Sequence, residues 1–193
     1  ERFYPVIEKL KHEFPNLRIA VHSALLDEVR ARRMESAGVD VAMMDVIGAQ
    51  ETIRDVYHLD RPVDDFEATL AALSATRMDV VPHIVIGLHY GRLLGEENAL
   101  DIISRHKIAA LILVVVSPIY APVDKPFATI STDDVAKIFV AARRRITNAP
   151  VQLGCIRPAG THKMITDAYA VMAGFDGIAY PAQGTVELAR AVG

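Results

Sequence analysis

Polar or reactive side chains stand where most of the apolar runs of this sequence end. The residues at these ends are His22, Asp45, His89, Ser117, Arg157 and Tyr180. If the runs form parallel strands, their ends meet at one edge of the sheet, where barrel enzymes assemble their active sites. Asp45 shares strand parity with Val41 and Met43, so an inward-facing carboxylate there could accept hydrogen bonds from a sugar hydroxyl or ligate a metal. A turn-forming aspartate is the alternative.

Three histidines could contact a ligand. His83 lies within an apolar run on the same face as Gly87, where a hydrogen-bonded core histidine is the alternative. His22 and His89 follow strand ends, so they could face a ligand or cap the surface. With Asp45 these side chains suit zinc or iron, but they come from different strands without an HxH or HExxH spacing, and we assign no metal ligand.

Cys155 and Arg157 are two residues apart, beside Pro158 and Gly160. If both side chains face a cavity, the guanidinium would favour the thiolate, and the two residues would form a candidate catalytic pair with Cys155 as ligand or nucleophile. Because the sequence names no neighbouring base, a buried and inert cysteine is the alternative.

The elements that must position these groups alternate between apolar runs and amphipathic segments. The run 78–90, rich in Val and Ile, predicts a strand buried on both faces. The other expected strands are 17–22, 39–45, 108–116, 151–156 and 176–180. The expected helices are 1–14, 24–37, 64–75, 95–106, 131–146, 161–173 and one from residue 185 onward. A long loop after Asp45 leads to Pro62, and loops of that length usually carry function.

Alternating βα units with Val/Ile-rich strands predict a parallel sheet covered by helices. Two architectures fit: an open doubly wound sheet and part of a (β/α)8 barrel. The Gly-x-Gly-x-x-Gly fingerprint of a dinucleotide-binding sheet is absent after every expected strand, whereas polar groups stand at nearly every strand end. We therefore expect one domain over residues 1–193, a partial barrel of about six βα units whose first two strands are missing.

The composition and charge of the chain argue against two classes of function, nucleic-acid binding and membrane binding. With 51% apolar residues and a formal net charge of −3, the chain offers no basic field for nucleic acid or an anionic membrane. The longest apolar run, 108–116, is far shorter than the roughly 20 residues of a spanning helix, and no signal peptide is evident. A lone cysteine excludes an internal disulfide and fits a reducing cytosol. We expect a soluble cytoplasmic protein.

Over nearly its whole length the sequence resembles the radical S-adenosylmethionine enzymes, specifically biotin synthase and the biotin-synthase-like proteins of two-component lipoyl synthases. The matching segments read SALLDEVRARRMESAGVDVAMMD, VVPHIVIGLHYG and GCIRPAGTHKMITDAYAVMAGFDGIAYP. The last segment is the most telling, because biotin synthases show a similar strand, an Ala-Gly turn and a helix ending in Met-Ala-Gly. The order and spacing of these segments carry the resemblance.

The resemblance implies roles for several residues. Asp45 looks like the polar residue after the fourth strand that holds the ribose of S-adenosylmethionine, and the Ile86-Gly87-Leu88 stretch resembles the fifth-strand motif that packs on the adenine. The family's acidic residue beyond that glycine is Tyr90 or Gly91 here. The resemblance further implies adenine contacts for Val115 and Ser117, and it places Cys155 and Arg157 near the arginine that biotin synthase sets beside its second iron-sulfur cluster, so we name these two as catalytic candidates. Our candidates for substrate contact are His22, His83, His89 and Tyr120.

One departure concerns the iron-sulfur cluster. The family holds a [4Fe-4S] cluster with three cysteines in a C-x3-C-x2-C loop after the first strand, and this chain has only Cys155. By itself it cannot make that site. We expect a missing N-terminal segment or a partner chain to complete the barrel. The intact enzyme would then use a 5'-deoxyadenosyl radical to abstract hydrogen from a small substrate such as a lipoyl or biotin precursor, with sulfur insertion as one outcome.

Two other functions stay open. One is a metal- or Schiff-base-dependent barrel lyase or hydrolase that uses the strand-end histidines and Asp45. The other is a non-catalytic partial barrel that serves as a binding module, with its edge strands covered by another subunit.

Overall fold

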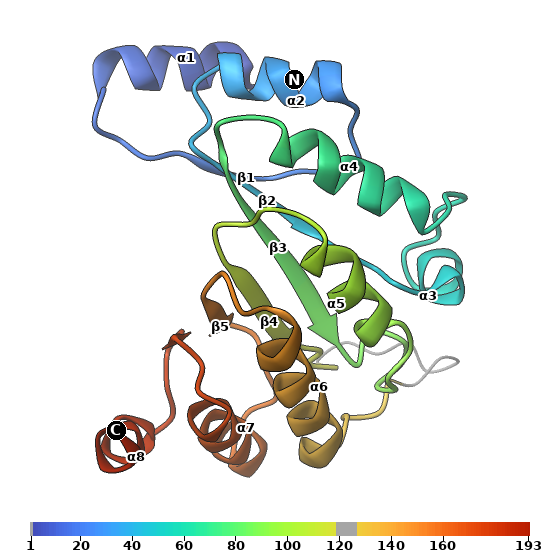
Figure 1. Cartoon of the computed structure of the whole chain (residues 1–193), viewed down its shortest axis with the longest axis vertical. Coiled ribbons are helices and arrows are strands. Elements are labelled where there is room, and N and C mark those ends of the chain that lie inside the picture. The colour runs from blue at the N-terminus through green and yellow to red at the C-terminus, as the bar shows by residue number, and fades with distance from the viewer. Residues whose placement is uncertain (1, 119–126) are drawn as a thin grey trace.

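The computed structural model describes residues 2–118 and 127–193, and within them a single six-stranded parallel sheet is flanked by helices (Figure 1). The strands are β1 (Ala20–His22), β2 (Val41–Asp45), β3 (Asp79–Ile86), β4 (Leu111–Val115), β5 (Val151–Leu153) and β6 (Gly177–Ile178). The helices are α1 (Tyr4–Glu13), α2 (Glu28–Ser36), α3 (Gln50–Asp55), α4 (Asp64–Ser74), α5 (Glu96–Ser104), α6 (Thr132–Arg145), α7 (Thr161–Met172) and α8 (Thr185–Val192).

Strand order decides between the two architectures. Each strand pairs in parallel with the next along the chain, in the order β1-β2-β3-β4-β5-β6. A doubly wound sheet reverses its order at a switch point, whereas a barrel adds each strand on the same side. The fold is therefore a partial (β/α)8 barrel of six βα units, as the sequence predicts, with β1 and β6 at its edges.

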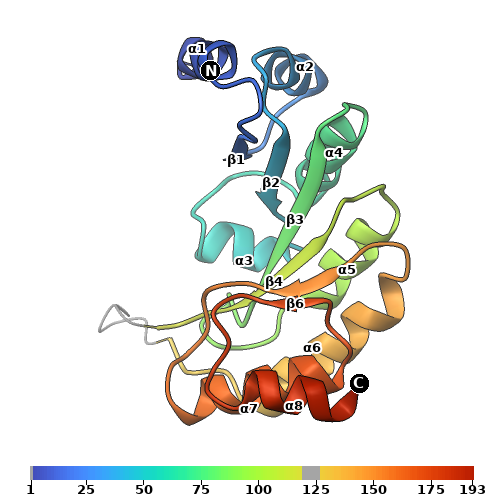
Figure 2. The same ribbon diagram turned by 90° about the vertical axis from the view of Figure 1, so that its left-hand side faces the viewer.

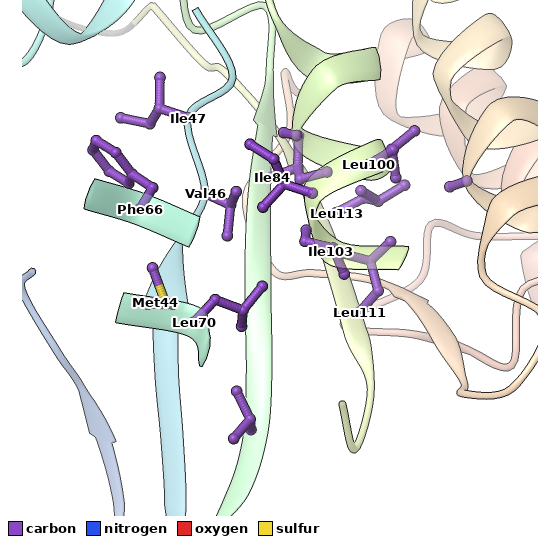
Figure 3. Close-up of a cluster of buried hydrophobic side chains, with 14 of the residues drawn as sticks. Met44, Val46, Ile47, Phe66, Leu70, Ile84, Leu100, Ile103, Leu111 and Leu113 are labelled. Atoms are coloured by element: carbon purple, nitrogen blue, oxygen red, sulfur yellow. The ribbon is translucent and has the colours of Figure 1, made fainter. Parts of the chain in front are cut away.

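The helices cover one face of this sheet. Helices α4, α5 and α6 lie side by side along that face, with α1 and α2 towards the β1 end and α7 and α8 towards the β6 end (Figures 1 and 2). Side chains that alternate along β2, β3 and β4 point into this helix layer, where Met44, Ile84 and Leu113 are at most 2% exposed. They pack with Leu70 of α4 and other helix residues in the core shown in Figure 3.

The opposite face, here called the inner face, is only half buried. It carries the alternate residues of the three central strands, including Met43, Val81, Val85 and Val114, whose exposure is intermediate. The expectation that β3 is buried on both faces is therefore wrong for this side. Val and Ile suit the interior of a barrel as well as a helix-covered face, so composition alone does not show how much of the barrel wall is present.

Two local features differ from the sequence-based expectation. The stretch after Asp45 was expected to be a loop, but it contains α3, a helix too short to display an apolar stripe. Helix α2 begins at Glu28 rather than directly after Ser23, because the side chain of Asp27 accepts a hydrogen bond from the Arg30 amide and caps the helix there. None of the helices among the described residues is long and apolar enough to cross a membrane.

Candidate functional site

Three predicted side chains converge where β1 and β2 end, beside the interior of β3. Asp45 is the register partner of His83, and His22 pairs with Met43 on the same side of the sheet. The ring centroids of His22 and His83 are 5.3 Å apart. Sequence alone places these residues on separate strands, and the parallel register brings them to one edge of the inner face.

Asp45 is held from two sides. His22 Nε2 lies 3.4 Å from its Oδ1, and the Tyr57 hydroxyl donates a hydrogen bond of 2.7 Å to its Oδ2. Burial, reinforced by the Asp45 charge, raises the pKa of Tyr57 far above its usual value, so this hydroxyl keeps its proton and stays a donor. The side chain of Asp45 is still 28% exposed and that of His22 46%, so both remain accessible from the inner face.

His83 has a fixed orientation within β3. Its Nδ1 lies 3.0 Å from the carbonyl oxygen of Val81. Burial lowers the pKa of His83, and the charge of His22 acts in the same direction, while the Val81 carbonyl and Asp45 oppose the shift. The ring is therefore both partly buried and aligned beside Asp45.

A buried carboxylate shapes the turn after β3. Gly87 has a φ of +78°, and its amide donates a 2.8 Å hydrogen bond to Glu96 Oε1, while the Leu94 amide donates to Oε2 at 2.7 Å. Burial raises the pKa of Glu96, although these two amides and its own favour the ionised form. Asp45 and Glu96 line one cavity of about 10 Å³, which has room for about one water, so a larger ligand beside Asp45 would lie outside this cavity.

Two of the residues proposed for the adenine, Ile86 and Val115, face the helix layer. The side chains of Ile86 and Val115 are fully buried in the helix layer. Their backbones also bond within the sheet: the Val115 amide donates to Ile156 and the Val116 amide donates to the Ile86 carbonyl. A cofactor could therefore contact these two residues only through backbone atoms.

Leu88 and Ser117, also proposed for the adenine, lie just beyond the ends of β3 and β4, and both are half-buried. Tyr120 lies outside the described residues.

His89 takes part in a different set of contacts. Its Nδ1 is 3.3 Å from Thr52 Oγ1 of α3, and its ring packs edge-on against Tyr90. The Tyr90 hydroxyl donates to the Asp55 carbonyl at 2.8 Å. These bonds join the β3–α5 turn to α3, so His89 supports the loop that also carries Tyr57.

The structure separates Cys155 from Arg157. Cys155 is exposed, so the alternative of a buried cysteine is wrong. The Arg157 guanidinium is fully buried and binds Asp167 through Nε at 2.5 Å and through Nη2 at 3.0 Å. Its remaining donors bond to the carbonyls of Gly154, Ala179 and Tyr180. These partners assign the guanidinium to holding the ends of β5 and β6 together, which is a different environment from the thiolate contact expected from the sequence.

Three residues that bind groups at the carboxyl ends of the strands were not predicted from the sequence: Tyr57, Glu96 and Asp167. Their bonds to Asp45, Gly87 and Arg157 join residues whose numbers differ by at least nine, so no local spacing predicts these contacts. A weak signal existed only for Glu96, an acidic residue in the first turn of α5. Among the described residues, no group of three or more His, Cys, Asp and Glu side chains could hold a metal ion.

Comparison with known proteins supports the fold. No family model and no curated protein sequence matches this chain. Among solved structures, methylornithine synthase (PylB) matches with a TM-score of 0.60 and 12% identity, over 92% of this chain and 51% of that one. The 2,3-dimethylmalate lyase of the PEP mutase/isocitrate lyase superfamily matches with a TM-score of 0.51 and 21% identity, over 96% and 66%.

A phosphonopyruvate hydrolase solved with oxalate and Mg²⁺ gives a TM-score of 0.51 at 14% identity, over 99% of this chain and 63% of that one. The chain thus spans about half to two thirds of the length of the structures it resembles. At these identities the likeness shows the fold, and this fold is shared by a synthase, a lyase and a hydrolase.

Proposed function

We propose that this chain forms the larger part of a radical S-adenosylmethionine barrel of the biotin synthase or lipoyl synthase type. The reaction class is hydrogen abstraction from an unactivated carbon of a small substrate, with sulfur insertion as the expected outcome in those families. The order of the sequence segments supports this proposal, and so does the fold shared with methylornithine synthase, itself a radical S-adenosylmethionine enzyme.

The main support from the site is the turn at Gly87. The sequence has Tyr90 or Gly91 where the family has an acidic residue beyond this glycine. In the structure Glu96 supplies a carboxylate to the same turn, bonded to the Gly87 amide at 2.8 Å. The turn therefore combines a glycine at positive φ with an acidic partner, and this supports the proposal although the acid comes from α5.

The residues of this chain do not fit a [4Fe-4S] cluster on their own. Such a cluster needs three cysteine thiolates from one loop, and the only thiol is that of Cys155, at the end of β5. The cluster-binding loop must come from another segment or another chain. Because the cluster lies outside this chain, its residues do not carry out the radical-forming step.

What this chain contributes is binding and orientation. Asp45, anchored by Tyr57, presents carboxylate oxygens that suit the hydroxyls of a ribose, and S-adenosylmethionine would supply the reactive group when bound there. His22 and His83 line the adjoining part of the inner face, where the substrate is expected. The helix layer covers the opposite face of the strands, so the ligand of this site is expected on the inner face.

The test is product formation by the complete enzyme. A polypeptide or complex that contains this chain together with a cysteine loop is reconstituted anaerobically with iron and sulfide and supplied with reductant and S-adenosylmethionine. We expect 5'-deoxyadenosine, and we expect Asp45→Asn to weaken S-adenosylmethionine binding while the exposed Asp101→Asn does not. Failure to form a cluster, together with no cleavage, would exclude the proposal.

A second candidate is a lyase or hydrolase that uses the strand-end histidines and Asp45. The favouring observation is the contact series His22–Asp45–Tyr57, since a carboxylate that orients an imidazole is a common acid–base arrangement. A Schiff base has no support from the strands, because none of the six described strands carries a lysine. Turnover of 2,3-dimethylmalate or phosphonopyruvate with Mg²⁺, and none of S-adenosylmethionine, would favour this candidate.

A further inference from the structure

His83 presents one ring nitrogen to the inner face in a defined hydrogen-bonding role. A carbonyl oxygen can only accept, so the 3.0 Å contact with Val81 requires that Nδ1 donates. In a neutral imidazole the second nitrogen then carries a lone pair and accepts. Within residues 2–118 and 127–193, Nε2 of His83 has no hydrogen-bond partner, so this acceptor is free for a ligand.

The surroundings keep the ring neutral. Burial is the largest influence on the pKa of His83 and lowers it from the ordinary value near 6.5. Of the charged neighbours, His22 lowers it further and Asp45 raises it, while the Tyr57 hydroxyl is neutral and already bonded to Asp45. At neutral pH the inner face therefore offers a nitrogen acceptor beside a carboxylate.

No cation balances these acceptors on the strands. None of the six described strands carries a lysine or arginine, and the Arg157 guanidinium is bonded to Asp167 and to three carbonyls. A carboxylate or phosphate placed beside His83 would meet the Asp45 charge and a lone pair, and no strand lysine or arginine would balance its charge, which is costly in a partly desolvated site.

We propose that His83 is a ligand-contacting residue whose Nε2 accepts a hydrogen bond from a hydroxyl, amide or ammonium group of the bound molecule. This part of the inner face then selects a neutral or cationic donor and rejects an anionic group at the same position. Any carboxylate or phosphate of the substrate must be held elsewhere. The inference rests on the proposed function only in that the inner face binds a small molecule.

The tautomer is the first test, and it is independent of any enzymatic activity. Nitrogen-15 NMR of the histidine rings at neutral pH is expected to show His83 with a protonated Nδ1 and an unprotonated Nε2. His83→Gln identifies the resonance by its loss. A protonated Nε2, or a ring protonated at both nitrogens, would overturn the inference even if the chain belongs to an active radical enzyme.

Ligand selectivity is the second test, with two small probes of similar size. The hydroxyl- and ammonium-bearing 1-amino-2-propanol is expected to shift the Nε2 resonance in a saturable manner, and lactate at the same concentration is not. His83→Phe should bind the amino alcohol about tenfold more weakly, as expected for one lost hydrogen bond, whereas His83→Gln retains an acceptor oxygen and stays close to wild type.

His12→Phe is the matched control, because His12 is exposed on α1. It should leave binding of both probes unchanged. Equal responses to the two probes, a saturable response to lactate alone, or no saturable response to either would overturn the proposal.

Discussion

Arg157 and Asp167 form an ion pair whose side chains are both fully buried. Removing one charge from such a pair leaves the other buried and uncompensated, which typically costs about 3–5 kcal/mol. We expect Asp167→Asn to lower the free energy of unfolding by about 3 kcal/mol in urea titrations. Asp101→Asn, which breaks the half-exposed pair with Arg145, should cost less than about 1 kcal/mol.

A double replacement separates charge from packing in this pair. Arg157→Met with Asp167→Leu removes both charges and fills the space with apolar atoms, so it should be more stable than Asp167→Asn alone. If Asp167→Asn is as stable as wild type, the pair does not fasten the ends of β5 and β6, and an active role for Arg157 regains support.

Glu96 provides a pH-dependent prediction at the same scale. Because burial raises its pKa, the folded chain binds a proton that the unfolded chain, with a glutamate pKa near 4.3, has already released. The stability linked to this proton is complete below about pH 4.3 and is lost as the pH rises through the raised pKa. We therefore expect the unfolding free energy of the wild type, minus that of Glu96→Gln, to decrease as the pH rises.

The measurement is urea unfolding at a series of pH values from about 4 upward. Glu97→Gln, in the same helical turn but exposed, controls for the loss of one negative charge. A wild-type minus Glu96→Gln difference that grows with pH would show instead that the Gly87 and Leu94 amides outweigh burial and hold the pKa of Glu96 low.

The sequence predicted the residues at the strand ends better than it predicted their hydrogen-bond partners. His22, Asp45 and His83 could be proposed because each follows from strand parity, a property of neighbouring positions. The Tyr57 bond to Asp45 and the Glu96 bond to Gly87 depend on how a loop and a helix fold back over the strand ends, which no local pattern specifies.

At the scale of the elements, the β2–α3 loop lies in close backbone contact with the start of α5. A Cβ added at Gly48 would lie 2.1 Å from the Gly95 carbonyl oxygen and 2.5 Å from the Ala99 nitrogen, and both are backbone atoms that cannot move aside independently. Gly48→Ala should therefore cost more than about 2 kcal/mol, as overpacking at a rigid contact does. It should also disturb the position of Asp45, because this loop directly follows Asp45 at the end of β2.

Gly177→Ala is the matched control for that substitution. A Cβ at Gly177 of β6 would meet only the Gln152 side chain, at 3.5 Å, and thermal unfolding should show little change. Equal destabilisation by both substitutions would mean that the loop after β2 can shift away from α5. The site would then be less rigid than its contacts suggest.

The elements also show where sequence patterns fail. All six strands were predicted because runs of Val and Ile bounded by turns are distinctive, although their ends were placed too far out by one to four residues at several positions. Helix α3 was missed because six residues, of which Thr52 and Ile53 are buried, cannot display a helical repeat. Its consequence is functional, since α3 brings Tyr57 to Asp45.

At the scale of the whole molecule, the sheet has two unpaired edges among the described residues. β3 and β4 are paired on both sides, whereas β1 pairs only with β2 and β6 only with β5. Local opening is cheapest where backbone hydrogen bonds are shared with one neighbour. We expect amides of β3 and β4 to exchange with deuterium at least about tenfold more slowly than those of β1 and β6.

Adding the missing wall of the barrel should change this pattern selectively. If the proposed function holds, a segment or partner that supplies the cysteine loop would pair with the free edges and cover the inner face, so exchange at β1 and β6 should slow while β3 and β4 change little. If the amides of all six strands of the chain alone were equally protected from exchange, and if this protection persisted on dilution, the partial barrel would not have unpaired edges. Protection that disappears on dilution would show instead that copies of the chain cover each other's edges.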